Sequence, residues 1–154
     1  MYMIIDKNVA GEVFGNPCKK DYQPIFSWID KKNGCIIYGG KNAIELFEVD
    51  KARDAIIKLD RAGKAKKMDY CELDKIEDSI VKSGFCVSND PHVLALARIS
   101  GTRFLCSKDV DLISDFGNLK ILPVPHGKVY KGYQSVEMLR KDGNYHAAPC
   151  YKCL

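Results

Sequence analysis

The stretch Ser88–Leu112, SNDPHVLALARISGTRFLCSKDVDL, contains a helical pattern and a strand pattern in direct succession. Asp90, followed by a proline, is typical of the residue before a helix, and Gly101 is typical of the residue that ends one. The apolar residues between them recur at helical spacing. Arg103–Ser107 then reads as a strand, and Asp109 follows just after it. The stretch therefore predicts an α/β unit with one acid before its helix and another after its strand.

Helices and strands are predicted to alternate along the rest of the chain. Met3–Ile5 and Cys35–Tyr38 are short apolar runs typical of strands buried on both faces, and Lys120–Val124 predicts a last strand whose proline suits a sheet edge. Helices are predicted over Asn8–Phe14, Pro24–Lys31, Lys41–Val49, Asp50–Ala65, Glu72–Ser83, Asp109–Phe116 and Gln134–Arg140. Such alternation favours parallel pairing through right-handed crossovers. We therefore expect an α/β fold, a three-layer α/β/α sandwich around a mostly parallel sheet, with Met3–Ile5 as the central strand.

Length and composition indicate one globular domain. The chain has 154 residues, of which 46% are hydrophobic and 29% charged. Residues 1–125 hold the predicted strands, and residues 126–154 are expected to form a C-terminal extension packed on this domain or trailing from it. No apolar run approaches the roughly 18 residues that cross a bilayer, and no basic leader precedes a long apolar segment. We expect a soluble, cytoplasmic protein with no membrane partner.

The seven cysteines do not resemble a disulfide framework. Most, such as Cys35 and Cys106, lie in apolar runs where a thiol packs as a small hydrophobic group. The exception is the tail, where Cys150 and Cys153 form a CxxC motif close to His146. One CxxC supplies only half of a structural zinc site, so free reduced thiols are the expected state.

The charge balance permits a nucleic-acid partner without requiring one. The formal net charge is +4, and basic residues gather in the segment RAGKAKK, which contains Lys64, Lys66 and Lys67. Lys41 follows a Gly-Gly pair, but the GxxxxGK pattern of a phosphate-binding loop is absent. These four lysines are candidates for contacts with RNA phosphates, although a solvated surface accounts for the same charges.

Acidic residues follow the predicted strands. Asp6 and Asp109 stand at or just past the carboxyl ends of two parallel strands, so the fold places both on one rim of the sheet. Glu45 lies on the helix that follows Cys35–Tyr38, and Asp90 opens the helix that leads back to the Asp109 strand. The sequence therefore predicts that four carboxylates converge on this rim.

Clustered carboxylates imply a bound cation. Like charges at close range raise one another's pKa, so such a cluster is expected to hold a positive ion. Hard oxygen ligands with no His or Cys nearby, as the sequence leads us to expect here, select Mg²⁺ or Mn²⁺ over zinc. Such an ion can orient a water as a nucleophile and neutralise a phosphodiester oxygen. The predicted chemistry is phosphodiester hydrolysis.

Four short motifs together resemble the PIN-domain family of nucleases over about residues 1–125. They are Asp6-x-Asn8, Gly39-Gly40-Lys41 before Glu45, Ser88-Asn-Asp90-Pro-His-x-Leu-Ala-Leu-Ala, and Cys106-Ser-Lys-Asp109-x-Asp111-Leu. The ordered succession of acids is more specific than any single motif, and the segment from Ser88 to Leu112 contributes most to it. The resemblance implies a PIN-like, Rossmann-like fold.

The resemblance also implies an activity and a set of site residues. In this family an acidic quartet binds Mg²⁺ or Mn²⁺ and cleaves RNA, commonly single-stranded, and many members are toxins of toxin–antitoxin pairs. The matching quartet is Asp6, Glu45, Asp90 and Asp109. Asn8 and Ser107 match polar residues that orient carboxylates or water, and Asp111 matches a fifth acid that only some members use. The expected partners are RNA, an antitoxin protein and a second copy of the chain.

Simpler roles are available for several of these residues. Asp90 and Asp109 could cap helices, a role compatible with metal binding. Glu45 could belong to a surface salt bridge. His92 and His126 could act as bases but are predicted to be surface or loop residues. The sequence also departs from the family's toxins in its long tail and in the Pro-His pair after the third acid.

Two other functions are compatible with the same fold. One is an RNA-binding or protein-interaction module without turnover, in which the acids are partly structural. The other is a phospho-accepting receiver domain, which also carries acids on this rim. A receiver requires paired acids beside the first strand, and Asp6 has no acidic neighbour. Our leading hypothesis is therefore a Mg²⁺/Mn²⁺-dependent endoribonuclease.

Overall fold

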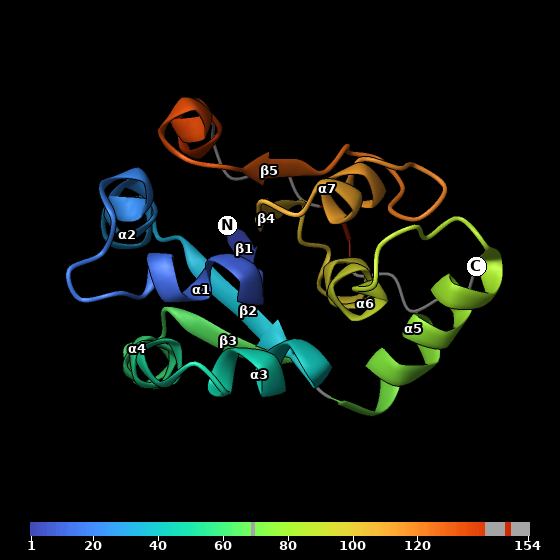
Figure 1. Ribbon diagram of the computed structural model, residues 1–154, viewed down its shortest axis with the longest axis horizontal. Helices are drawn as coiled ribbons and strands as arrows, with labels where there is room; N and C mark the ends of the chain where they lie inside the picture. The colour runs from blue at the N-terminus through green and yellow to red at the C-terminus, as the bar shows by residue number, and fades with distance from the viewer. Residues whose placement is uncertain (69, 141–146, 149–154) are drawn as a thin grey trace.

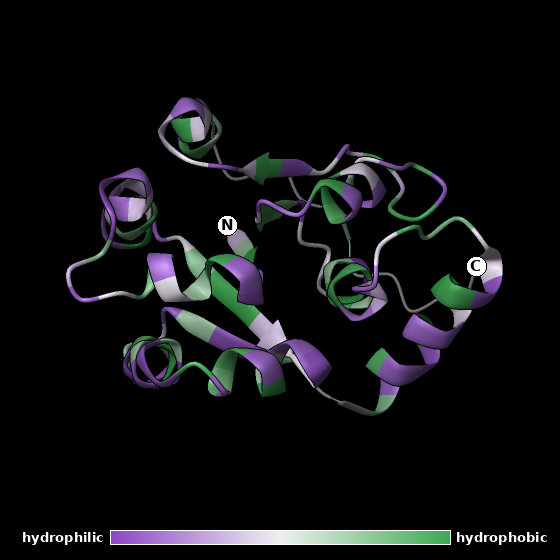
Figure 2. Cartoon of the chain, viewed as in Figure 1, coloured by the Kyte–Doolittle hydropathy of each residue, from purple (hydrophilic) through white to green (hydrophobic). Residues whose placement is uncertain are grey.

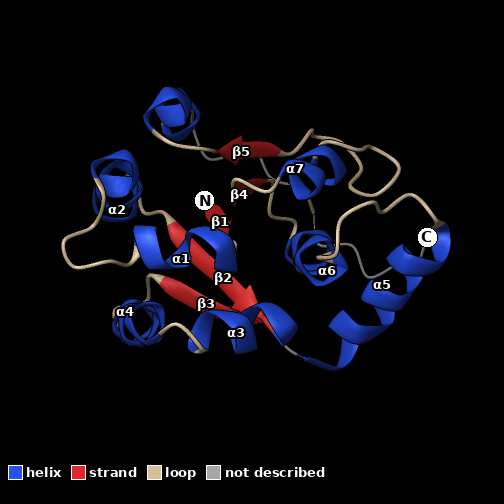
Figure 3. Cartoon of the chain, viewed as in Figure 1, coloured by secondary structure: helices blue, strands red, loops and turns tan. Residues whose placement is uncertain are grey.

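Five parallel strands form the sheet in the computed structural model, which describes residues 1–68, 70–140 and 147–148 (Figures 1 and 3). Their spatial order is β3-β2-β1-β4-β5, so the first strand of the chain is the central one, as predicted. The strands are β1 (Tyr2–Ile5), β2 (Cys35–Gly39), β3 (Ala65–Met68), β4 (Phe104–Cys106) and β5 (Lys128–Tyr130).

Helices cover both faces of this sheet, which confirms the three-layer α/β/α architecture. The helices are α1 (Lys7–Val13), α2 (Gln23–Lys31), α3 (Gly40–Phe47), α4 (Asp50–Arg61), α5 (Tyr70–Ser83), α6 (Pro91–Ser100) and α7 (Val110–Phe116), with 3₁₀ helices η1 (Lys20–Tyr22) and η2 (Tyr133–Leu139). Figure 1 shows α1, α2 and α4 on one side of the strands and α5, α6 and α7 on the other.

The alternation of side chains along β1 explains the two cores. Met3 and Ile5 pack with residues of α1, α2 and α4, whereas Ile4 packs with residues of α5, α6 and α7. All three side chains are fully buried. Successive residues of a strand point to opposite faces, so a continuous apolar run is what a sheet covered on both sides requires. In Figure 2 most of the visible length of β2, which lies beside β1, has the green colour of hydrophobic residues.

Two predictions about the sheet edges were wrong. Lys120–Val124 is a turn in which Ile121 and Leu122 are buried, and the strand beside β4 is β5 instead. The helix predicted over Asp50–Ala65 ends at Arg61, and β3 follows it as an edge strand that the sequence pattern did not indicate. The sheet therefore takes its last strand from beyond residue 125, and η2 packs against α2.

The carboxyl ends of the strands lie at one rim of the sheet because all the pairings are parallel. Asp6 follows β1, and its N–H donates to the carbonyl of Cys106 at the end of β4 at 3.0 Å. At the end of β2, Gly40 has φ +54°, a left-handed conformation that suits glycine and turns the chain into α3. The rim thus gathers the ends of β1 and β4 and the start of α3.

No helix in the described part of the chain is long and apolar enough to span a bilayer. The tail motif predicted from His146, Cys150 and Cys153 lies outside the described residues.

Candidate metal centre

Ser107 connects two of the predicted acids. Its hydroxyl donates to Asp6 Oδ2 at 2.6 Å and accepts from the main-chain N–H of Asp109 at 3.0 Å. Asp109 also accepts from the N–H of Leu112 at 2.8 Å through Oδ1, so it caps α7 as the sequence allowed. Ser107 is fully buried and Asp6 is 3% exposed, so this network fixes both acids at the ends of β1 and β4.

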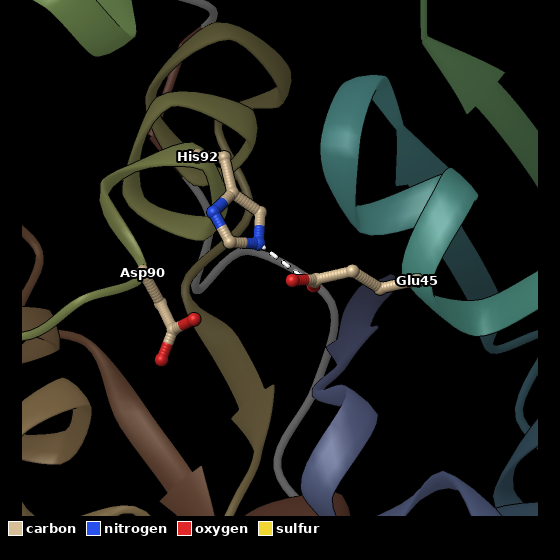
Figure 4. A group of neighbouring side chains, drawn as sticks. All are labelled: Glu45, Asp90 and His92. Carbon is tan, nitrogen blue, oxygen red and sulfur yellow. Dashed lines mark hydrogen bonds and ion pairs between the residues drawn. The ribbon is translucent and has the colours of Figure 1, made fainter. Parts of the chain in front are cut away.

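Glu45, Asp90 and His92 form a second group on the same rim. Each offers one possible ligand atom, and these atoms lie within 4.8 Å of one another. His92 Nε2 is 2.9 Å from Glu45 Oε2. Figure 4 shows that Glu45 reaches this place from α3, while Asp90 and His92 come from the start of α6. The partner of the Glu45 carboxylate is therefore His92. Among the described residues, Glu45 forms no ion pair with a lysine or arginine, so the surface salt bridge that the sequence allowed is not observed.

The prediction that His92 is a surface or loop residue was wrong. Its side chain is only 8% exposed and lies in the first turn of α6, which contacts α3. Asp90, just before this helix, makes no capping hydrogen bond with any described residue. Helix capping therefore does not explain why an acid stands at position 90.

The carboxylates of the two groups influence one another's ionisation. Burial raises the pKa of Asp6, and the charges of Asp109 and Glu45 raise it further, although the hydrogen bond from Ser107 opposes them. Burial likewise raises the pKa of Asp90, with added contributions from the charges of Asp6, Glu45 and Asp109, which the charge of His92 opposes. The neighbouring carboxylates thus disfavour the ionised forms of Asp6 and Asp90.

These donors fit a hard divalent cation. Carboxylate oxygens are the ligands that Mg²⁺ and Mn²⁺ prefer, and an imidazole nitrogen is accepted by Mn²⁺. A positive ion would also relieve the repulsion that raises the pKa values of Asp6 and Asp90.

Asn42 is a supporting residue that the sequence pattern did not reveal. It is fully buried in α3, and its Nδ2 donates to the carbonyl of Ile5 at 3.1 Å. This bond ties the helix that carries Glu45 to the strand that ends at Asp6. A polar residue shortly after a Gly-Gly turn was the only signal in the sequence.

Asp115 supports the rim from α7 and was also missed. Its carboxylate, 2% exposed, accepts from the N–H groups of Val87 at 3.1 Å and Ser88 at 2.8 Å. It also accepts from the thiol of Cys86 at 3.3 Å. Burial, and to a lesser degree Asp115, raises the pKa of Cys86 to about 11, so this thiol stays protonated at neutral pH. Asp115 therefore holds the segment that leads to Asp90.

Two other predicted side chains lie outside this network, although the main-chain N–H of Asn8 lowers the pKa of Asp6 through a hydrogen bond. Asp111 is exposed in the first turn of α7, and Asn8 is exposed in the first turn of α1. The structure therefore does not bring either side chain into the buried part of the centre.

The four candidate RNA-binding lysines differ in their surroundings. Lys41 forms an ion pair with Glu77 at 2.6 Å, and Lys64 donates to the carbonyl of Ile29 at 3.3 Å. Lys66 and Lys67 are exposed on β3. Lysines on an edge strand also discourage pairing with another sheet, which is a structural reason for their presence.

Replacing Ser107 by alanine should shift the pH dependence of the centre. The hydroxyl donates to ionised Asp6 and lowers its pKa, so its loss raises that pKa further. Because a carboxylate must be ionised to bind a cation, the midpoint of Mn²⁺ binding should move to higher pH. Calorimetric titrations between pH 5 and pH 8 would measure the shift. Ser114→Ala, an exposed serine on α7, is the control, and an equal midpoint in both variants would contradict the role given to Ser107.

Comparisons with known proteins do not show to which family the chain belongs, so the family stays a prediction from the sequence. No protein-family profile matches the chain, and no curated protein matches it significantly. Among solved structures, the chain is similar to one described as VapBC2 from Rickettsia felis bound to a DNA fragment from their promoter. The TM-score is 0.49 and the sequence identity 13%, over 86% of this chain and 99% of that chain.

Proposed function

We propose that this protein is a Mg²⁺- or Mn²⁺-dependent endoribonuclease whose ion or ions are held by Asp6, Glu45, Asp90 and Asp109. The observation that supports this most is the convergence of four carboxylates from separate segments at the carboxyl rim of the sheet. Such a cluster opposes its own ionisation, and a divalent cation removes that cost. Ligand sites of open α/β sheets also lie at this rim.

The residues of the chain have distinct tasks in this proposal. When bound, a divalent ion supplies positive charge to a phosphodiester as negative charge develops on it. Ser107 keeps its proton directed at Asp6 Oδ2, which favours ionised Asp6. The cap of α7 fixes Asp109, and Asp115 fixes the segment before Asp90. The carboxylates are thus oriented before any substrate arrives, which lowers the cost of reaching the transition state.

RNA as the substrate is supported by the charge of the chain and by its sequence motifs. The net charge of +4 favours binding to a phosphate backbone, and Lys66 and Lys67 present exposed positive charge. The motifs around Asp6, Asp90 and Asp109 resemble those of PIN-domain nucleases. A role as the toxin of a toxin–antitoxin pair, with an antitoxin as partner, rests on that sequence resemblance alone.

Cleavage of a mixed RNA pool tests the proposal. The purified full chain with Mn²⁺ should produce fragments with new internal ends, EDTA should abolish them, and excess Mn²⁺ should restore them. RNA binding without cleavage, measured by gel shift in the same buffers, would instead favour an RNA-binding module. Cleavage that persists in EDTA would reject the metal centre.

A further inference from the structure

We propose that His92 is itself a ligand of the bound ion and gives the centre a preference for Mn²⁺ over Mg²⁺. The inference rests on the proposed divalent ion but adds a ligand that the acidic quartet does not contain. It also gives a role to the Pro-His pair by which this sequence departs from the toxins that it resembles.

The position of the imidazole supports ligation. Its Nε2 lies 2.9 Å from Glu45 Oε2, and the ligand atoms of Glu45, Asp90 and His92 lie within 4.8 Å of one another. Neighbouring ligands about 2.1 Å from an octahedral ion are about 3 Å apart, which is close to the separation of His92 from Glu45. In Figure 4 the ring is directed toward the space between the two carboxylates.

The burial of His92 makes this position a fixed one. The side chain is 8% exposed, in the first turn of a helix whose residues from Val93 to Ala97 are fully buried. Proline at the first position of α6 restricts the backbone immediately before His92. The ring has therefore lost most of its rotamer freedom on folding. Binding an ion would restrict the ring little further, so the entropic cost of ordering it would not weaken ion binding.

The chemistry of the donor explains the expected selectivity. Mg²⁺ binds oxygen ligands almost exclusively. Mn²⁺ also prefers oxygen ligands, but as a first-row transition metal it accepts an imidazole more readily than Mg²⁺ does. Carboxylates serve both kinds of ion, so they do not discriminate strongly between them. A nitrogen ligand in the centre therefore favours Mn²⁺.

His92 could instead only orient Glu45 through their hydrogen bond. The substitution His92→Gln separates the two roles, because the glutamine amide can still donate to Glu45 while it lacks the imidazole nitrogen. If His92 only orients Glu45, the glutamine variant should keep its affinity for Mn²⁺. If His92 is a nitrogen ligand, the variant should bind Mn²⁺ more weakly.

Electron spin-echo spectroscopy of Mn²⁺ bound to the full chain provides the direct test. We expect modulation from a directly coordinated ¹⁴N nucleus that changes to a ¹⁵N pattern when the protein is grown with ¹⁵N-histidine, which requires no substitution. The modulation should vanish in His92→Gln. It should remain in His126→Gln and His146→Gln, which remove the other two histidines of the chain.

Calorimetry of the same variants measures the selectivity. Loss of the His92 ligand should weaken Mn²⁺ binding by about 100-fold, because even the loss of a residue that only supports a metal ligand can weaken binding that much. Mg²⁺ binding should weaken by about tenfold or less. Equal losses for the two ions, or bound Mn²⁺ without nitrogen modulation, would overturn the role of His92 and leave the proposed nuclease standing. Failure of native protein to bind either ion would overturn both.

Discussion

The substitution Asp6→Asn should abolish RNA cleavage and, at the same time, stabilise the metal-free protein. Asparagine can still accept the hydrogen bond from Ser107 but carries no charge at the buried end of β1. It removes the repulsion from Asp109 and Glu45 and the cost of burying a carboxylate. It also removes a metal ligand, so we expect cleavage to fall by more than about 100-fold.

The effect on stability has a defined pH dependence. Because the pKa of folded Asp6 is raised above the ordinary aspartate value of 3.8, the folded protein binds the proton more tightly than the unfolded chain. The contribution of Asp6 to stability is complete below that ordinary value and is lost as pH rises through the folded pKa. In EDTA at pH 7, Asp6→Asn should therefore melt at a higher temperature than native protein, and the difference should shrink toward pH 4.

Asp74→Asn is the matched control for this prediction. Asp74 is an exposed carboxylate on α5, and its replacement should change neither cleavage nor melting temperature appreciably. Added Mn²⁺ should raise the melting temperature of native protein and of the control, but not that of Asp6→Asn. A metal-free Asp6→Asn protein that melts below native protein at pH 7 would show that Asp6 is a structural residue.

The substitution Asp115→Asn should cause the largest loss of stability among the charge-neutralising changes at this rim. The carboxylate accepts from two main-chain N–H groups, whereas an amide offers one acceptor oxygen and turns an NH₂ group toward these donors. Hydrogen bonds to charged groups contribute about 1.5 to 3 kcal/mol each, so the free energy of unfolding should fall by about 3 kcal/mol. Urea unfolding measures this change.

Amide hydrogen exchange should locate the destabilised segment in the Asp115→Asn variant. The amides of Val87 and Ser88 should exchange faster in Asp115→Asn, and because this segment leads to Asp90, Mn²⁺ affinity should fall by about tenfold. Asp111→Asn, on the exposed side of the same helix, should change the unfolding free energy by no more than about 0.5 kcal/mol. Equal effects of the two substitutions would mean that Asp115 does not anchor the segment.

The centre of the sheet was predictable because burial on both faces leaves a clear pattern. Met3–Ile5 and Cys35–Tyr38 are uninterrupted apolar runs, and such runs belong to strands covered on both sides. Once these strands are taken as parallel, their carboxyl ends must share a rim. The sequence alone therefore predicts that Asp6 and Asp109 lie at the same rim.

The edges of the sheet were not predictable by the same reasoning. β3 carries two exposed lysines in succession, so it resembles the charged end of the preceding helix. Ile121 and Leu122 are buried in a turn, which gives a strand-like apolar run without a strand. An apolar run indicates that a segment is buried, but it does not show that the segment pairs as a strand. At the edge of a sheet a paired strand can be exposed and a buried segment can be unpaired.

The supporting residues were hidden for a different reason. Asn42, His92 and Asp115 matter through contacts with residues 27 or more positions away in the chain. Each could equally be a solvated polar residue when read locally. Only the packing of α6 against α3, and of α7 against β5, reveals what these side chains touch.

The order of the strands has a consequence for when the protein can act. Asp6 and Ser107 are 101 positions apart, and β1 lies between β2 and β4. Because synthesis proceeds from the N-terminus, Asp6 and Glu45 leave the ribosome long before the strand that carries Cys106 and Ser107. A nascent chain that stops short of this strand cannot assemble the cluster. Under the proposed function, RNA cleavage therefore cannot begin until this strand has been synthesised.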